Sequence, residues 1–431
     1  MSAGSGARRE VTIVGAGIVG ISAAINLQRD GCKVTVVDRG PPGEGTSMGN
    51  AGVFASCGFV PVATPGFAWK APGMLMDPLG PLSLRWSYMP RMIPWLVSFL
   101  RNSSPQAVER IADAMSALVG SSVEDHLALA AGTGAEQWVR PSPYLYVYAD
   151  EAAFLAESYA WGLRRARGVK WATLRGDAVR EFEPALGSDY RFAVVLERHG
   201  YTPDPLQLVT ALAAHFVREG GTVLQREVKD IEIGADGPTR LLTDQGPVDI
   251  GRLVISAGAW SGRLAARLGS PVPLESERGY HVTLQEPGLM PRYPIMSTGG
   301  KFVATPMACG LRAAGIVEFG GLDAPAKPDM TLRLLKHVKN LFPGVSTEKY
   351  TEWMGHRPSL PDSLPVISRS PHFESVFFAF GHQHVGITAG PKTGRLVADM
   401  VAGRVPTIDI SPFSVNRFQA ARRPVADPAM A

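Results

Sequence analysis

The sequence is poor in cysteine and in long apolar runs. Its 431 residues include only three cysteines, Cys32, Cys57 and Cys309, which lie far apart and lack metal-ligand spacing. This pattern excludes a disulfide framework and predicts reduced thiols, in the core or lining a cavity, of a cytoplasmic protein. No stretch reaches the roughly 18 unbroken apolar residues that a membrane-spanning helix needs.

Charge is also scarce and nearly balanced. The net charge is +4, and no basic run is longer than Arg164-Arg165 and Arg422-Arg423. This balance argues against nucleic-acid binding. With 45% hydrophobic and 19% charged residues, the chain has the composition of an ordered globular protein, and its length suits two domains that share an interface. The first ten residues are small and polar and lead directly into an apolar run, so we expect no targeting peptide there.

Glycine is plentiful, and its most informative placement is near the N-terminus. The β-branched runs 11–14 and 34–37 predict two parallel strands, with a helix over 18–30 between them. In the turn before the helix, Gly15 permits a tight bend, Gly17 lets the backbone approach a pyrophosphate, and Gly20 lets the helix pack close to the strand. The helix directs its N-terminal N–H groups and positive dipole end at the phosphates.

An acidic residue completes this dinucleotide-binding fingerprint. Asp38 ends the second strand, where a carboxylate accepts hydrogen bonds from a ribose 2′-hydroxyl and thereby favours an unphosphorylated ribose. The fingerprint by itself leaves FAD and NAD open. We expect cofactor contacts from Gly15, Ala16, Gly17, Ile18, Val19, Gly20, Asp38 and Arg39.

The rest of the chain predicts an α/β protein with a discontinuous cofactor domain. A helix capped by Asp204-Pro205, a meander of short strands over 222–250 and a buried strand from Leu253 would complete a Rossmann-like FAD-binding domain of the glutathione-reductase type. Helices over 108–129 and 331–341 and strands over 144–148, 278–284, 302–305 and 310–319 suggest a second, antiparallel-sheet α+β substrate domain. The expected boundaries are 1–65, 201–265 and 355–431 for the cofactor domain, and 66–200 and 266–354 for the substrate domain.

Two C-terminal motifs carry the chemistry. Residues 353–365 predict a proline-stiffened loop that presents Arg357, and residues 376–401 predict a strand, a glycine-rich loop and a helix from about Ala389. The helix N-terminus near 386–388 is a second anion site. A flavin needs such a site, because negative charge accumulates at N1 and C2=O when it is reduced. This feature favours FAD over NAD.

These motifs together resemble a known family. The fingerprint, Thr46-Ser-Met-Gly-Asn-Ala-Gly52, Ser256-Ala-Gly-Ala-Trp260, Gly355-His-Arg-Pro358 and Gly381-His-Gln-His-Val-Gly386 stand in the order of FAD-dependent D-amino acid dehydrogenases of the D-amino acid oxidase superfamily. The likeness spans nearly the whole chain. The His-Arg-Pro-Ser-Leu-Pro-Asp-Ser-Leu-Pro run and the histidine pair are most similar to the bacterial hydroxy-D-proline dehydrogenase branch, which often has glycine where this chain has Gln383.

The resemblance implies roles for matching residues. Arg357 would bind the substrate carboxylate, for which a guanidinium fork is a natural partner, with a structural salt bridge as the alternative. Tyr280 would add a hydroxyl to that carboxylate unless it belongs to the core, and His384 would touch substrate or flavin unless it is a structural loop histidine. No metal and no definite catalytic residue are expected. Further cofactor contacts would come from Thr46, Ser47, Asn50, Ala51, Gly52, Val228, Ala257, Gly258, Trp260, Gly381, Val385, Gly386, Ile387 and Thr388.

The implied reaction is oxidation of a D-amino acid, of the D-proline or cis-4-hydroxy-D-proline type, by hydride transfer from Cα to flavin N5, which yields an imine. The alternatives are a secondary-amine oxidase of the glycine, sarcosine or L-proline type and a non-catalytic flavoprotein subunit. The electron acceptor (quinone, dye or oxygen) and the oligomeric state stay open. The aromatic-rich segment 66–100 either packs over the active site or makes peripheral contact with a membrane.

Overall fold

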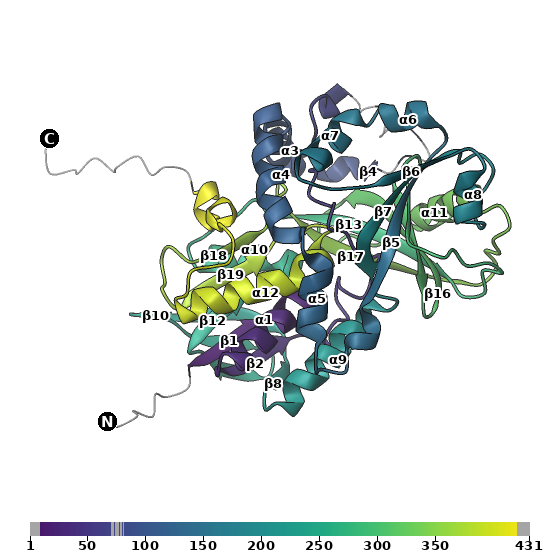
Figure 1. The fold of residues 1–431 in the computed structure, drawn as a ribbon. Coiled ribbons are helices and arrows are strands. Elements are labelled where there is room, and N and C mark those ends of the chain that lie inside the picture. Colours follow the sequence, from purple (N-terminus) through teal and green to yellow (C-terminus); the bar gives the residue numbers. More distant parts are fainter. Residues whose placement is uncertain (1–8, 70–72, 74–76, 78–79, 81, 420–431) are drawn as a thin grey trace, which may run out of the picture.

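A computed structural model describes residues 9–69, 73, 77, 80 and 82–419. The expectations about an N-terminal leader and about Arg422-Arg423 concern residues outside this range. Within it, two large β-sheets and the helices that cover them form the molecule, with the cofactor fingerprint and the C-terminal helix side by side in one half (Figure 1).

The first sheet is built from strands that are far apart in the sequence. Its spatial order is β18-β19-β12-β1-β2-β8, and every neighbouring pair is parallel except β18 with β19. The chain therefore leaves this sheet after β2 and adds strands to it again from three later segments, which supply β8, β12 and the pair β18 and β19. The strands are β1 (Glu10–Val14), β2 (Lys33–Asp38), β8 (Thr222–Gln225), β12 (Arg252–Ile255), β18 (Val366–Arg369) and β19 (Val376–Phe380).

Helices cover this sheet because their apolar faces match it. Helix α1 (Ile18–Arg29) packs on α12 (Gly386–Ala402) and on α9 (Pro205–Arg218), and their buried side chains share one hydrophobic core. The N-terminus of α9 is capped by Asp204, whose carboxylate accepts from the N–H groups of Leu206 and Gln207. The predicted meander is present as β9 (Val228–Gly234), β10 (Gly237–Thr243) and β11 (Gly246–Asp249), while β8 joins the large sheet instead.

The second sheet has ten strands and is mixed, whereas the sequence predicts an antiparallel one. Its order is β17-β13-β16-β15-β14-β5-β7-β3, with β4 beside β16 and β6 beside β7. The pairs β14–β5 and β4–β16 are parallel. The strands are β3 (Val53–Phe54), β4 (Leu82–Leu84), β5 (Arg140–Tyr148), β6 (Ala172–Arg175), β7 (Phe192–Tyr201), β13 (Glu275–Leu284), β14 (Ile295–Ser297), β15 (Phe302–Met307), β16 (Gly310–Phe319) and β17 (Tyr350–Ser359).

One expected loop is a strand. The sequence predicts a proline-stiffened loop from residue 353, but residues 350–359 form β17 and pair with β13 along their full length. Pro358 is compatible with a strand here because β17 lies at the edge of the sheet, where a missing N–H leaves no ladder hydrogen bond unmade. Arg357 therefore has a fixed place in a strand rather than on a loop.

One of the remaining predicted helices is divided in the structure. The predicted helix over 108–129 is divided near Gly120 into α4 (Pro105–Val119) and α5 (Ser122–Ala130), and both contact α12 of the other half. Helix α11 (Pro328–Leu341) packs on β13 and β16 as a cover for the second sheet. The other helices are α3 (Met89–Arg101), α6 (Glu151–Leu155), α7 (Ser158–Ala166), α8 (Ala178–Phe182) and α10 (Ser261–Arg267).

Two strands from the segments expected in the cofactor domain lie in the second sheet. Strand β3, from the segment 1–65, and the end of β17, from 355–431, belong to the second sheet. The three thiols are free, with Cys57 buried, Cys32 partly buried and Cys309 on the surface, where the sequence had predicted a core or cavity position. No helix within the described residues has the length and apolar character needed to cross a membrane.

Candidate cofactor and substrate site

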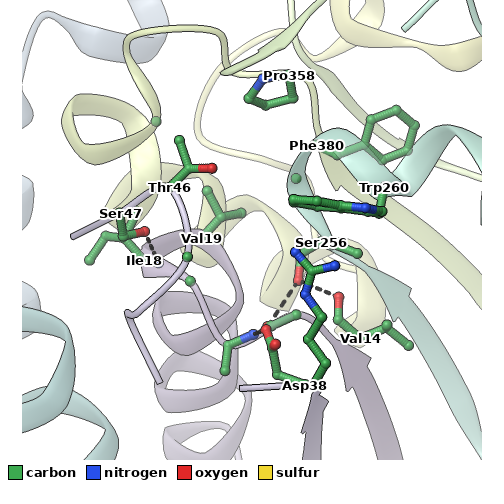
Figure 2. A pocket seen from close by; sticks show the side chains of 18 of the residues that line it. Val14, Ile18, Val19, Asp38, Thr46, Ser47, Ser256, Trp260, Pro358 and Phe380 are labelled. Carbon is green, nitrogen blue, oxygen red and sulfur yellow. Dashed lines mark hydrogen bonds between the residues drawn. The ribbon is translucent and has the colours of Figure 1, made fainter. Parts of the chain in front are cut away.

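An elongated cavity of about 400 Å³ lies at the carboxyl ends of the parallel strands of the first sheet. Its walls come from the fingerprint turn, the loop after β2, the segment after β12 and the loop between β19 and α12. Figure 2 shows Asp38 and Ser47 on the fingerprint side, with Trp260, Pro358 and Phe380 across from them. This is the position at which open α/β sheets bind ligands.

The fingerprint glycines are required by contacts with their neighbours. Gly15 has φ +114°, and a Cβ there would lie 2.3 Å from the carbonyl oxygen of Ser256. A Cβ on Gly20 would lie 1.9 Å from the carbonyl oxygen of Gly15, so the helix could not approach the turn. A Cβ on Gly17 would meet Ser47 Oγ at 3.2 Å and narrow the cavity wall. These contacts match the three steric roles that the pattern predicts.

Asp38 lines the cavity and also braces the turn. Its Oδ2 accepts from the N–H of Ala16 at 2.6 Å and its Oδ1 accepts from the N–H of Gly40 at 3.1 Å. A carboxylate has about four acceptor positions, so two remain for a ribose. The N–H of Ile18 is bound by Ser47 Oγ at 3.1 Å, which joins the loop after β2 to the start of α1 (Figure 2).

A second helix N-terminus faces the same cavity. Helix α12 begins at Gly386, and Gly386 and Ile387 line the cavity together with Gly381. The start of α12 is anchored from α5, because His126 Nε2 donates to the Ile387 carbonyl at 2.7 Å and Ser122 Oγ donates to the Thr388 carbonyl at 2.7 Å. Two helix N-termini on one cavity suit the pyrophosphate of a dinucleotide at one of them and its flavin ring at the other. The residues present therefore fit FAD.

Most of the predicted cofactor contacts lie in this cavity. Gly20, Ala51, Gly52, Val385 and Thr388 do not line it. Gly20 instead packs against the turn, and Gly52 (φ +78°) packs against Thr202. The predicted residues in the wall are Gly15, Ala16, Gly17, Ile18, Val19, Asp38, Arg39, Thr46, Ser47, Asn50, Val228, Ala257, Gly258, Trp260, Gly381, Gly386 and Ile387.

The cavity wall also contains several cationic residues that the sequence does not predict as cofactor contacts. Arg226, Lys229 and Arg263 line the cavity in addition to Arg39. The Arg39 guanidinium lies 3.8 Å from the centroid of the Trp260 ring, a cation–π contact across the cavity wall. No local pattern predicts these residues as cofactor contacts, because the segment around β9 and helix α10 join the cavity wall only in the folded chain.

Arg357 projects from β17 across the neighbouring strands β13 and β16 and does not itself line the cofactor cavity. Its guanidinium covers Gly279 of β13, where an added Cβ would lie 2.5 Å from Cζ. On the same strand face, Trp353 stacks on His281, and His281 Nδ1 contacts the carbonyl oxygen of Gly49 at 3.0 Å. Pro358, the next residue after Arg357, lines the cofactor cavity. Arg357 thus lies close to the cofactor end of the sheet.

The charge of Arg357 is not matched by an ion pair. Within the described residues, no carboxylate oxygen lies within 4.0 Å of its guanidinium, and its one hydrogen bond goes from Nη2 to the Gly315 carbonyl at 3.4 Å. Burial lowers the pKa of Arg357, and the negative charge of Glu277 partly offsets this effect. A structural salt bridge was the alternative role for Arg357, and the described residues contain no such salt bridge.

Tyr280 is on the wrong side of the sheet to help Arg357. Residues opposite each other in β13 and β17 share a face, and Arg357 is opposite Glu277, so Tyr280 three residues along points the other way. Its hydroxyl donates to Glu318 and accepts from the N–H of Lys327, and its ring belongs to the core under α11. These contacts favour the core role, which the sequence leaves open for Tyr280 beside substrate binding.

His384 lies in the loop before α12, within electrostatic reach of Arg357. Loss of hydrating water around the imidazole lowers the pKa of His384. The negative charge of Glu277 raises this pKa, and the positive charge of Arg357 lowers it. The loop is tied to β17 by a hydrogen bond from the N–H of Gln383 to the Pro358 carbonyl at 3.0 Å. Gln383 has φ +49°, a conformation that explains why glycine suits this position. His382 is buried, and its Nε2 contacts Thr393 Oγ1 at 3.0 Å. In the described part of the chain, no group of three or more metal-ligating side chains is present.

The fold and the site define a dinucleotide-dependent oxidoreductase, and comparison with known proteins specifies its family. The model of the FAD dependent oxidoreductase (DAO) family matches residues 10–400. The chain is 38% identical to a D-amino-acid oxidase of Bradyrhizobium diazoefficiens over 417 residues, with 95% of this chain and 99% of that protein covered. It is 31% identical to a D-amino acid dehydrogenase of Rhizobium rhizogenes, with 95% and 100% covered.

Solved structures show the same fold at lower identity. Glycine oxidase from Geobacillus kaustophilus superposes with a TM-score of 0.72 at 23% identity, covering 95% of this chain and 99% of that one. L-proline dehydrogenase from P. horikoshii superposes with a TM-score of 0.68 at 19% identity, covering 95% and 98%. The chain belongs to the FAD dependent oxidoreductase family, and it is an enzyme whose cofactor is FAD.

Proposed function

We propose that the protein oxidises a D-amino acid of the D-proline or cis-4-hydroxy-D-proline type, with Arg357 as the anchor for the substrate carboxylate. The observation that carries the proposal is the Arg357 guanidinium, which lies on a strand face beside the cofactor loop and makes no ion pair among the described residues. A partly buried guanidinium without a counter-ion is a strong binding site for a carboxylate, which it can hold with two parallel hydrogen bonds. The relatives that carry the names D-amino-acid oxidase and D-amino acid dehydrogenase support this substrate class.

The protein's part in such a reaction is to position the substrate. Bound FAD supplies the hydride acceptor. The fingerprint turn and the start of α1 would hold the pyrophosphate, and the N-terminus of α12 would stabilise negative charge on the flavin ring. Arg357 would orient the amino acid so that Cα faces the flavin. These roles require no general base from the chain.

An anaerobic flavin-bleaching screen tests this function. We expect D-proline, cis-4-hydroxy-D-proline or another D-amino acid to bleach the flavin, and glycine, sarcosine and L-proline to leave it yellow. Bleaching by glycine or sarcosine alone would establish the secondary-amine oxidase instead, and no bleaching by any amine would indicate a non-catalytic flavoprotein. Repeating turnover with oxygen, a quinone and a dye distinguishes an oxidase from a dehydrogenase.

We also propose that the segment containing α3 touches a membrane surface. The inner side of α3 is buried through Met92, Trp95 and Phe99, which pack on Phe319 of the second sheet. Its outer side is apolar as well, because Ile93, Val97 and Leu100 are exposed. Nearby, Trp86 is 75% and Trp69 is 90% exposed. Exposed tryptophans beside an apolar helix face suit the interfacial region of a bilayer.

Vesicle sedimentation tests this contact. We expect the wild-type protein to sediment with anionic vesicles, and a Trp86→Ser, Ile93→Ser variant to stay in the supernatant with its flavin bleaching intact. Equal sedimentation of the two proteins would refute membrane contact through this segment.

A further inference from the structure

A carboxylate stands directly opposite Arg357 in the sheet. In the antiparallel pair of β13 and β17, Glu277 is the partner of Arg357, and both side chains are partly exposed. Directly opposed residues in such a pair have Cβ atoms about 5 Å apart and share one face of the sheet. An arginine and a glutamate in this arrangement would ordinarily form an ion pair.

The two side chains point away from each other instead. The Arg357 guanidinium extends over Gly279, which leaves room for it because it has no side chain, and its Nη2 donates to Gly315. Glu277 extends in the opposite direction, where its Oε2 accepts from Ser359 Oγ at 2.8 Å. No nitrogen of Arg357 lies within 4.0 Å of a Glu277 oxygen in the described structure. The strand face therefore presents a positive and a negative group at opposed positions, each with its own hydrogen-bond partner and with no ion pair between them.

The two charges act on the same surroundings. Glu277 raises the pKa of His384 while Arg357 lowers it, so the three side chains lie within electrostatic reach of one another. The charge of Glu277 also opposes the effect of burial on the pKa of Arg357. A ligand that approaches Arg357 in this region meets the field of Glu277 as well.

This arrangement complements a zwitterion. We infer that Glu277 binds the positively charged amino group of the substrate while Arg357 binds its carboxylate, so that the site recognises the amino acid by both of its charged groups. The inference rests on the proposed role of Arg357 and extends it from carboxylic acids in general to amino acids. It predicts that the enzyme rejects hydroxy acids and other amine-free acids of the same shape, because these leave Glu277 without a partner and place a second negative group beside it.

Two matched ligand pairs and one isosteric variant test the inference. The FAD-loaded protein is reduced under nitrogen so that no amino acid can react, and ligand affinity is measured by isothermal titration calorimetry. The pairs are D-proline with tetrahydro-2-furoate and D-alanine with propionate, which differ chiefly in the amino group. The variant is Glu277→Gln, which keeps the shape of the side chain and an acceptor for Ser359 but removes its charge.

We expect Glu277→Gln to change the two kinds of ligand in opposite directions. Amino acids should bind about tenfold or more weakly, the size of effect that loss of a charge-assisted hydrogen bond produces. The amine-free acids should bind more tightly, because Arg357 loses a competing negative charge. Ser359→Ala, which removes the hydroxyl that holds the Glu277 carboxylate, should shift the ratio in the same direction by a smaller factor.

Glu275→Gln is the matched control. It removes the same charge two residues earlier in β13, where the carboxylate is bound by the Tyr88 hydroxyl at 3.0 Å and has no contact with Arg357. The ratio of amino acid affinity to amine-free acid affinity should be unchanged in this variant.

Three outcomes would overturn the inference, and they separate it from the proposed function. If Glu277→Gln tightens both kinds of ligand, Glu277 is only a counter-ion to Arg357. If the wild-type protein binds amine-free acids as tightly as amino acids, the carboxylate role of Arg357 survives and the role of Glu277 does not. If the wild-type protein binds neither kind, or if Arg357→Ala binds all four ligands as the wild type does, the proposed function itself fails.

Discussion

The two ends of the candidate site are formed by different kinds of chemical groups. At the nucleotide end, backbone groups provide the surface, because glycines bring the chain close and helices α1 and α12 present their N-termini. At the substrate end, charged side chains on neighbouring strands provide it, and the register of β13 and β17 decides which side chains meet. The first end depends on glycines, which have no side chains. The second end depends on which residues of β13 and β17 are paired and so share one face of the sheet. A single added carbon should therefore be enough to damage the first end, and a change of charge at one side chain should be enough to damage the second.

The largest effect is expected at Gly20. Alanine is the better helix former by about 1 kcal/mol, but the added Cβ would lie 1.9 Å from the Gly15 carbonyl oxygen. Overpacking of this kind costs about 1–3 kcal/mol or more, which should outweigh the gain in helix propensity. We expect Gly20→Ala to purify without FAD, as measured by the ratio of flavin to protein absorbance. Gly40→Ala, where the added Cβ meets no atom within 4 Å, is the control and should stay yellow.

A change at the substrate end should spare the cofactor. We expect Arg357→Ala to bind FAD normally and to lose about 100-fold or more in the rate of flavin reduction per unit substrate concentration, because it loses a bidentate charged contact. Stopped-flow spectroscopy under nitrogen measures this rate. Arg369→Ala, on β18 of the other sheet, removes an arginine that lies over Phe377 and should reduce at the wild-type rate. A normal rate for Arg357→Ala would mean that the carboxylate binds elsewhere.

Buried histidines at both ends should make the fold sensitive to acid. Burial lowers the pKa of His126 to about 4 and the pKa values of His281 and His382 to about 3. The unfolded chain binds protons at these sites near the ordinary value of about 6.5, so it takes up more protons than the folded chain as the pH falls below that value. The free energy of unfolding should therefore fall by about 1.4 kcal/mol per pH unit for each histidine between about pH 6 and pH 4.

Urea titrations at several pH values measure this slope. His126→Gln should be less stable at pH 7, because it loses the contact of the His126 ring with Phe54, and should show a slope smaller by about 1.4 kcal/mol per pH unit. An unchanged slope in this variant would show that His126 is not held neutral in the fold.

The smallest effect is expected at Tyr280. Tyr280→Phe removes the hydroxyl that binds Glu318 and the N–H of Lys327, so it should lower the free energy of unfolding by about 1 kcal/mol. Because Tyr280 faces α11, flavin reduction and substrate affinity should stay at their wild-type values. A loss of substrate affinity comparable to that of Arg357→Ala would place Tyr280 back in the substrate site.

The two ends also differ in how far they can be predicted from the sequence. The nucleotide end is encoded within residues 11–38, and each steric role of Gly15, Gly17 and Gly20 corresponds to a contact in the structure. The start of α12 was predicted for the same reason, since a glycine-rich loop before a helix is a local pattern. Trp260 and Arg39 were expected near the cofactor, but their contact with each other depends on packing that no local pattern encodes.

The substrate end resisted prediction because its residues come together only through pairing. Arg357 was identified from its motif, but the prolines around it suggested a loop, and an edge strand that tolerates proline was not foreseen. The sequence leaves Tyr280 open between the substrate site and the core, because faces alternate along a strand and a shift of one residue reverses the face. Glu277 was missed because it is 80 positions from Arg357 in the sequence and becomes its neighbour only when β13 meets β17.

The strand order of the first sheet has a consequence for how the chain reaches this state. Strand β1 pairs with β12, which is synthesised much later, and β12 pairs with β19, which is synthesised later still. Helix α1 likewise packs against α12. The first sheet therefore cannot be completed until β12 and β19 have been synthesised. Until then the apolar strand β1 lacks one of its two partner strands. Such distant pairings slow folding and expose unpaired strands to aggregation. The arrangement that brings distant segments together around one cofactor thus makes the folding of β1 and α1 dependent on β12, β19 and α12, which are synthesised much later.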